Sequence, residues 1–319
     1  MALGAPLVLP RSEARRLEVL FFGAPTANHP GHDPVTRYRV LKKHLGDDGI
    51  NLTYLEDPAV ALNPATLQHV DAVLMYANWE QRGTMPADQE KALVDFVESG
   101  GGFLPIHCAS ACYGQSEAFV KLVGGVFKSH GGEVFAPETV KDDHEITRDY
   151  EGFEAWDETY VHERLTDDRT ILQERDGEPW SWIREQGKGR VFYTASGHDH
   201  RVWDQPAFHD LLKRAIYWAV GTETKAKLDA LALPEFEMMD VQLPGYIERQ
   251  LVTSVPKPFP PEESLKLAQV PPGFELSLFA ADPDIVNPIA IAWDARGRAF
   301  VVETIDYPNN LQAGNIGHD

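Results

Sequence analysis

The sequence of 319 residues is poor in cysteine, in basic side chains and in long apolar runs. Its two cysteines, Cys108 and Cys112, lie in one short stretch, which excludes a disulfide framework. The 29 basic residues are outnumbered by 49 acidic ones, and a net charge of −20 repels phosphate backbones and anionic lipid surfaces. No apolar run reaches the roughly 18 residues of a membrane-spanning helix. The sequence therefore argues against nucleic acid as a partner and against a transmembrane segment.

The N-terminus shows no secretory signal. Residues 1–10 are mildly apolar, but they lack a basic leader and a long apolar segment. We expect residues 1–15 to be an N-terminal tail. A cytoplasmic location is the default expectation, and export would require that a leader has been removed.

Proline and histidine divide the chain into two parts. Residues 1–222 hold 12 prolines, whereas the much shorter stretch 223–319 holds 11. Eleven of the 12 histidines lie before residue 223, and only His318 follows it. Because histidine suits both proton transfer near neutral pH and metal binding, we expect any chemistry to lie in the first part.

The first part alternates strand and helix patterns. Helices with apolar residues at helical spacing are predicted over 34–45, 86–98 and 206–220. Buried strands are predicted over 17–22, 52–55, 70–76, 103–106 and 189–195. Alternation with short connections is typical of a mainly parallel sheet with helices on both faces, so we predict a doubly wound α/β domain.

The second part changes character. Residues 223–265 have no sustained period, which predicts an extended linker stiffened by proline. Three short strands are predicted after it, over 274–280, 288–293 and 299–303. Because so few short strands do not make a core of normal size, residues 266–319 are expected to be an incomplete second domain.

Histidines occur in three loops that follow predicted strands. His29 and His32 follow the first strand, His107 follows the fourth, and His198 and His200 follow the strand that ends near residue 195. Open parallel sheets bind ligands beyond the carboxyl ends of their strands, so the three loops indicate a functional cleft. The alternative is that each histidine is a hydrogen-bonded structural residue.

A divalent metal is one use for these side chains. His29, His107 and His198, together with Asp157 or Glu158, could supply the two or three imidazoles and one carboxylate of such a site. No compact ligand motif such as His-Glu-x-x-His occurs in the sequence. The sequence therefore favours a hydrogen-bonded polar cluster over a metal site.

Cys108 invites interpretation as a nucleophile, with His198 or His200 as its base. It follows a predicted strand and opens a predicted helix, where the pKa of a thiol is lowered. A nucleophile at such an elbow needs small, glycine-flanked neighbours, but His107 occupies the place directly after the strand. We expect Cys108 to be a buried apolar residue.

Carboxylate and aromatic side chains cluster near residue 157. Asp157 and Glu158 follow Trp156 and precede Tyr160, so they could act as acid, base or acceptor for sugar hydroxyls. The alternative is a turn with a capping aspartate. Three tryptophans either stack on a sugar ring or fill the core, namely Trp180, Trp182 and Trp203.

Several motifs resemble those of the ThuA-like (trehalose utilisation) family, and their order and spacing agree from about Arg16 to Gly221. The matching segments are Gly100 to His107, His144 to Thr147, Asp157 to Tyr160, Gly187 to Tyr193, Gly197 to Asp199 and Tyr217 to Gly221. Glu145 departs from the family, which often has proline there, and this matters little for the fold.

The resemblance implies a domain over 16–222 with the fold of class I glutamine amidotransferases, flavodoxin-like in outline. It also implies that the Cys-His-Glu machinery of those enzymes is not retained, in agreement with the position of Cys108. The family is linked to carbohydrate use, in particular to keto-sugars. We therefore expect a small carbohydrate as partner, and a hydrolase, lyase or isomerase reaction if the domain is an enzyme.

Within this resemblance, His107 and His198 are the expected acid/base pair, and Asp157 or Glu158 is the carboxylate that orients them. The expected sugar contacts are His29, His32, Tyr160, Asp199 and Trp203. Two alternatives remain open. One is a non-catalytic sugar-binding or docking module attached to an oxidoreductase propeller, and the other is a hydrolase or amidotransferase that uses Cys108.

The C-terminal part has a resemblance of its own. Residues 270–276 and 302–308 resemble the opening blade of a β-propeller in membrane-bound dehydrogenase-like proteins of planctomycete and verrucomicrobial type. Those proteins often continue into a haem-binding Cys-x-x-Cys-His domain, and that motif does not occur here. The resemblance implies an N-terminal piece of such an architecture, with the propeller and haem domain as partners in a longer protein.

Overall fold

The computed structural model describes residues 14–79, 83–244 and 251–304. These residues fall into two units, which are described separately. The larger unit comprises residues up to 232 together with 269–274, and the smaller one comprises 233–268 and the residues from 275 onward. None of the helices in these described ranges is long and apolar enough to cross a membrane.

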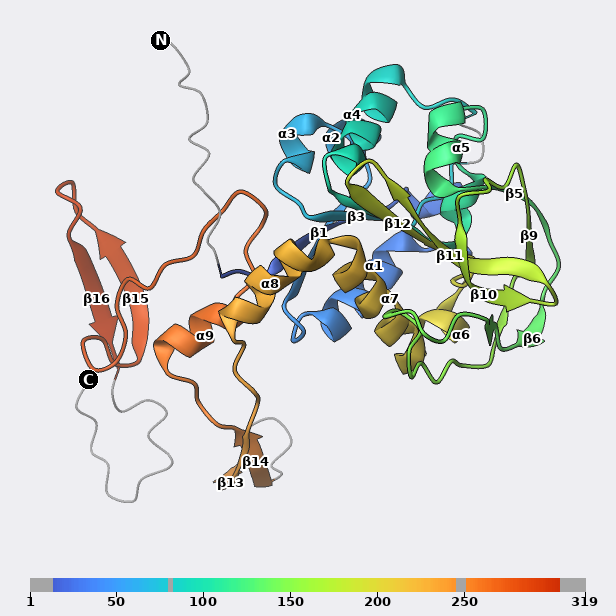
Figure 1. The fold of residues 1–319 in the computed structure, drawn as a ribbon. Coiled ribbons are helices and arrows are strands. Elements are labelled where there is room, and N and C mark those ends of the chain that lie inside the picture. Colours follow the sequence, from blue (N-terminus) through green and yellow to red (C-terminus); the bar gives the residue numbers. More distant parts are fainter. Residues whose placement is uncertain (1–13, 80–82, 245–250, 305–319) are drawn as a thin grey trace, which may run out of the picture. The chain divides into compact units, whose positions relative to one another are not determined.

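An eight-stranded sheet forms the centre of the larger unit (Figure 1). Its order is β2 (Ile50–Leu55), β1 (Leu17–Phe22), β3 (Ala72–Met75), β4 (Gly102–Pro105), β12 (Gly189–Thr194), β11 (Glu178–Gln186), β10 (Thr170–Arg175) and β7 (Glu138–Thr139). The first five strands pair in parallel, and the last three join them antiparallel. The prediction of a mainly parallel sheet is confirmed.

Helices cover both faces of this sheet, as Figure 1 shows. One face carries α1 (Pro34–Leu45), α6 (His200–Trp203), α7 (Pro206–Ala219) and α8 (Gly221–Leu231), and the other carries α2 (Pro58–Ala61), α3 (Pro64–Leu67), α4 (Ala87–Glu98) and α5 (Glu117–Val123). Two 3₁₀ helices complete the set, η1 (Thr26–Asn28) and η2 (His107–Ala111). In this unit, the observed ends of the predicted strands and helices differ from the predicted ends by no more than two residues.

Burial on both faces explains the apolar strands. Every residue of β3 and β4 is buried, because helices lie above and below them. Helix α7 buries one continuous stripe, which includes Phe208, Leu212 and Ile216. Each large apolar side chain so buried stabilises the fold by about 1.5–3 kcal/mol.

Two small antiparallel sheets lie beside the large one. β5 (Val126–His130) pairs with β9 (Tyr160–Glu163), and β6 (Glu133–Phe135) pairs with β8 (Ala155–Asp157). β8 and β9 follow each other closely, so that Glu158 lies in the tight turn between them. The sequence patterns did not predict these four strands.

The C-terminal part of the chain differs from its prediction in two places. The expected extended linker over 223–265 instead contains regular elements, namely α8 in the larger unit and β13 (Met238–Pro244), β14 (Leu251–Pro256) and α9 (Pro261–Leu267) in the smaller one. Residues 274–280 form no strand, although they alternate in polarity. A strand requires a hydrogen-bonding partner, and β15 (Pro288–Trp293) and β16 (Ala299–Glu303) pair only with each other in the described part of the chain. Those last two strands are as predicted.

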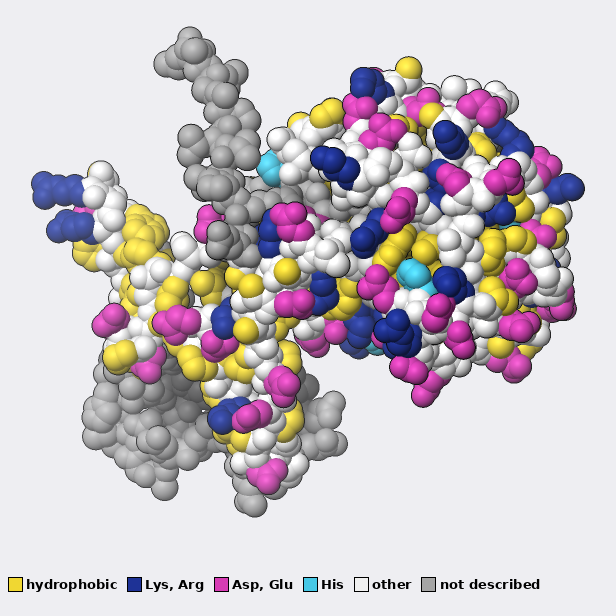
Figure 2. Space-filling view, viewed as in Figure 1, with side chains coloured by type: hydrophobic (Ala, Val, Ile, Leu, Met, Phe, Trp, Pro, Cys, Tyr) yellow, Lys and Arg dark blue, Asp and Glu magenta, His cyan; other side chains and the backbone are white. Residues whose placement is uncertain are grey.

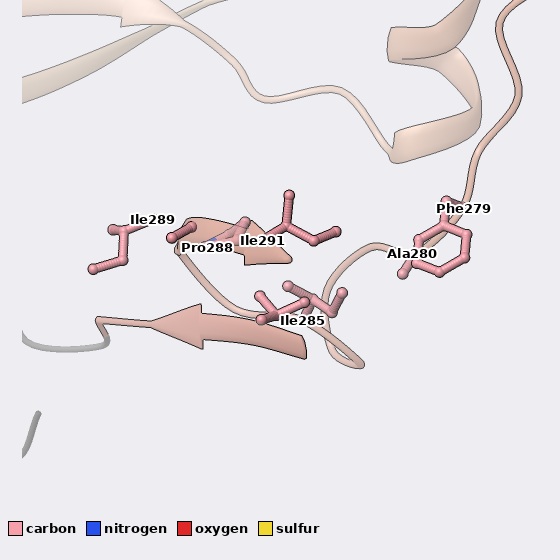
Figure 3. Close-up of a pocket in the computed structure, with 8 residues that line it drawn as sticks. Phe279, Ala280, Ile285, Pro288, Ile289 and Ile291 are labelled. Atoms are coloured by element: carbon pink, nitrogen blue, oxygen red, sulfur yellow. The ribbon is translucent and has the colours of Figure 1, made fainter. Parts of the chain in front are cut away.

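The hairpin of β15 and β16 exposes apolar side chains. Ile289, Ile291 and Trp293 are each more than half exposed. Figure 2 shows hydrophobic side chains gathered over this unit, whereas acidic and basic side chains intersperse over the larger one. A shallow apolar pocket lies on the hairpin, with Phe279 and Ile285 among its lining residues (Figure 3).

Candidate functional site

Four side chains bring metal-type donor atoms together at the carboxyl edge of the large sheet. They are His32, His107, Glu158 and His198, and one donor atom from each lies within 4.8 Å of all the others. His32 follows β1, His107 follows β4 and His198 follows β12, and these strands belong to one parallel run in the sheet. Glu158 reaches the same place from the turn between β8 and β9.

Capping aspartates fix the ends of two of these loops. Asp33, directly after His32, accepts a hydrogen bond from the backbone N–H of Thr36 and caps α1. Asp199, directly after His198, caps α6 in the same way through the N–H of Arg201. Each histidine therefore sits at the entry of a helix, where the following backbone holds its position.

His107 is the most enclosed member of the cluster. Its side chain is fully buried, and its ring stacks on that of Tyr160 with the centroids 4.2 Å apart. Its Nδ1 lies 2.6 Å from the carbonyl oxygen of Ala195. A carbonyl only accepts, so Nδ1 carries the hydrogen of this contact, and Nε2 is the ring nitrogen that faces Glu158 and His32. The backbone of His107 has a φ of 49°, an unusual conformation for a side-chain-bearing residue, and such strain is common at functional sites.

His32 links the other two imidazoles. Its Nε2 lies 3.2 Å from Nε2 of His107 and 3.1 Å from Nδ1 of His198. Its Nδ1 contacts the side-chain amide of Asn78 at 3.0 Å. Burial lowers the pKa of His32 to about 3, and the opposing effect of Glu158 does not offset it. His32 is therefore neutral at physiological pH.

Glu158 is the anionic member of the cluster. Its carboxylate oxygens lie 3.3 Å from Nε2 of His107 and 3.2 Å from Nδ1 of His198. Burial opposes ionisation, but the contacts with His107, His198 and His32 outweigh it and hold the pKa of Glu158 far below its usual range. The same contact raises the pKa of His198, although burial acts against it. Glu158 and His198 thus each favour the charged form of the other.

Asp157 binds backbone N–H groups rather than the imidazoles of the cluster. Its carboxylate accepts hydrogen bonds from the N–H groups of Gly197 (2.9 Å), His198 (3.1 Å) and Glu158 (2.9 Å). Burial raises the pKa of Asp157 in spite of these bonds. Of the two carboxylates predicted for the site, Glu158 therefore meets the histidines and Asp157 holds the two segments that carry His198 and Glu158.

The predicted sugar contacts separate into two groups. His29 stacks on His32, with ring centroids 4.2 Å apart, and so lies beside the cluster. Trp203 is fully buried, and its Nε1 donates to the carbonyl of Gly197 at 2.8 Å, so it has no face for a sugar ring. Tyr160 is also buried, and its ring contacts the cluster by stacking on His107, described above. Asp199 is engaged in its cap and in an ion pair with Arg201.

The remaining candidates lie in the core. Cys108 and Cys112 are buried free cysteines, which agrees with the apolar interpretation. Trp180 and Trp182 are fully buried and fill the core.

Sequence reasoning missed two residues at the site. Asn78 follows β3, so the rule that pointed to the other loops applies to it as well. His130 ends β5, and its Nδ1 lies 3.7 Å from a carboxylate oxygen of Glu158, with the side chain 43% exposed. No local pattern marks His130, because the small sheet that carries it is formed by long-range pairing.

The mixed α/β architecture with a large, mainly parallel central sheet is consistent with the fold of class I glutamine amidotransferases. Residues 18–219 match the family model of ThuA, described as trehalose utilisation. The chain belongs to the ThuA family. Residues 260–318 match a second model, the domain of unknown function DUF7133.

Solved structures agree on the fold. A ThuA-like protein from Bacteroides uniformis is 20% identical, with a TM-score of 0.53, and the match covers 67% of this chain and 95% of that one. A ThuA-like protein from Parabacteroides merdae is 15% identical, with a TM-score of 0.54 and coverage of 65% and 90%. Comparison with curated proteins gives no match.

Proposed function

We propose that the ThuA domain acts in carbohydrate utilisation, by acid/base chemistry on a keto-sugar or an oxidised disaccharide at the histidine–carboxylate cluster. One observation carries the proposal: a buried neutral imidazole, His32, and a proton-holding one, His198, share a single carboxylate. Environments that push the pKa values of neighbouring groups apart are typical of acid/base pairs. The family description supports a carbohydrate as the ligand.

The exposure of the cluster suggests which members meet the sugar. The side chains of His107 and His32 are 0% and 3% exposed, whereas those of Glu158 and His198 are 10% and 15% exposed. In this proposal His198 exchanges the proton with the ligand, Glu158 orients the imidazoles, and His107 and His32 lie behind them. A carbonyl next to a C–H bond makes that proton removable by a general base, which is why a keto-sugar suits the site better than the parent sugar.

The test is a turnover screen with 3-keto-glycosides beside the corresponding unoxidised glycosides. We expect turnover of the keto form, its loss in His198→Ala, and its retention in His200→Ala, whose side chain is 69% exposed next to the site. Unchanged turnover in His198→Ala would refute the assignment. Saturable sugar binding that survives the joint loss of His107 and His198 would instead identify a non-catalytic binding or docking module.

We further propose that residues 266–319 belong to a β-propeller blade. The support is the antiparallel pairing of β15 and β16 and their exposed apolar side chains, since an isolated two-stranded hairpin is only marginally stable. Amide hydrogen exchange on the full chain tests this. We expect the amides of β15 and β16 to exchange much faster than those of β3 and β4. Equally slow exchange would show that the hairpin needs no further strands.

A further inference from the structure

We propose that His32, His107, His198 and Glu158 bind one divalent first-row transition-metal ion such as Zn²⁺. The ion would sit at the cluster already described, and its role in catalysis rests on the proposed function. The binding of the ion does not rest on the proposed function, because binding can be measured with no sugar present.

The distances between donor atoms fit a metal ion. The Nε2 of His32 lies 3.2 Å from that of His107 and 3.1 Å from Nδ1 of His198. Oε2 of Glu158 lies 3.3 Å from Nε2 of His107 and 3.9 Å from Nε2 of His32, and its Oε1 lies 3.2 Å from Nδ1 of His198. Ligand atoms held 2.0–2.1 Å from an ion in tetrahedral geometry are about 3.3 Å apart. One donor atom from each residue lies within 4.8 Å of all the others, so the four side chains bind one ion after a small inward movement.

The hydrogen bond of His107 directs one of its ring nitrogens at the cluster. Its Nδ1 donates to the carbonyl of Ala195, so its Nε2 faces a carboxylate oxygen of Glu158 and Nε2 of His32. Imidazole nitrogens and a carboxylate oxygen that meet in one buried site are the donors that a divalent transition-metal ion binds.

The surroundings of the cluster match those of known metal sites. Histidines that bind a metal usually donate their other ring N–H to a backbone carbonyl or another fixed acceptor, as His107 does to Ala195. The side-chain amide nitrogen of Asn78 lies 3.0 Å from Nδ1 of His32 and fixes the direction of that ring, and a flip of the amide would present its oxygen to an Nδ1–H. Asp157 fixes the backbone of His198 and Glu158. All four ligands thus have a second layer of support, two through their rings and two through their backbone.

The donor set selects the class of ion. Three imidazoles and one carboxylate suit Zn²⁺, Ni²⁺, Fe²⁺ or Cu²⁺, whereas Mg²⁺ and Ca²⁺ prefer oxygen ligands. Expansion to five ligands would admit a sugar oxygen on the side of His198 and Glu158, where an ion polarises a carbonyl as a Lewis acid. His198 would exchange the proton of the proposed function only in the ion-free site.

The experiment is a titration of the chelator-treated full chain with Zn²⁺ in competition with a chromophoric chelator. We expect one ion per chain. His32→Ala and Glu158→Gln should each weaken binding at least about 100-fold, and Asn78→Ala about 10–100-fold, the range for a supporting residue. His200→Ala, a neighbouring histidine outside the cluster, should bind as the wild type does. Circular dichroism of each variant checks that it is folded, and Glu158→Gln keeps the shape of the side chain.

The wild-type titration alone can overturn the inference, because it needs no variant to fold. Absence of stoichiometric binding, or unchanged affinity in folded Glu158→Gln, refutes the metal site. Sugar turnover by fully chelated, ion-free protein refutes a catalytic role of the ion but leaves the proposed function standing. Stoichiometric binding of Zn²⁺ by a protein that turns over no keto-sugar supports the metal site and refutes the proposed function.

Discussion

His162 makes the stability of the ThuA domain depend on pH. Its side chain is fully buried. Its Nε2 lies 2.9 Å from the hydroxyl of Tyr193, and its Nδ1 lies 3.4 Å from a carboxylate oxygen of Glu178. Tyr193 in turn donates to the backbone carbonyl of His107. This chain of contacts therefore connects the titration of His162 to the backbone that carries a member of the cluster.

Burial lowers the pKa of His162 below the ordinary value of 6.5, and the contact with Glu178 does not compensate for it. Above pH 6.5 the ring is neutral in both the folded and the unfolded chain, so its contribution to stability does not change. As the pH falls below 6.5, the unfolded chain takes up the proton and the folded chain does not. The free energy of unfolding then decreases, by up to about 1.4 kcal/mol per pH unit for this one group, until the folded pKa is reached.

Urea unfolding at a series of pH values between 7.5 and 5 measures this slope. We expect His162→Gln, which keeps a polar group at the same place, to lose stability less steeply below pH 6.5 than the wild type. His200→Ala should keep the wild-type slope, because it removes an exposed histidine that lies outside this chain of contacts. Chelator in every sample removes any contribution from bound metal. Parallel slopes for the wild type and His162→Gln would refute this reasoning.

Three further outcomes follow from burial and hydrogen bonding. Asp157→Ala leaves three backbone N–H groups without their acceptor, so we expect urea unfolding to show that the free energy of unfolding falls by at least about 2 kcal/mol. The control Asp143→Ala, at an exposed carboxylate, should change it little. Phe208→Ala should cost about 3–5 kcal/mol by the same assay, against less than about 0.5 kcal/mol for Phe274→Ala, whose side chain is 73% exposed. Cys108 should react with a thiol reagent only after unfolding, and rapid labelling of the native chain would contradict its burial.

The sequence patterns predicted the central architecture because its causes are local. Burial between two layers explains the apolar runs of β1 and β3 and the helical spacing of α1 and α7. The observed ends of these elements lie within two residues of the predicted ends. Residues 274–280 show the limit of such patterns. They alternate like a strand but form none, because a strand also needs a partner that local sequence does not supply.

At the site, strand patterns in the sequence were enough to predict that histidines from three loops meet at one edge, since parallel strands bring their carboxyl ends together. Which atoms face each other could be read only from the folded chain. It places His32 rather than His29 among the four donors, and it directs Asp157 to backbone N–H groups and Glu158 to the imidazoles. The reason is physical. The order of strands and helices follows from patterns along the chain, whereas side-chain direction depends on the small sheets β5–β9 and β6–β8, which form only through long-range pairing.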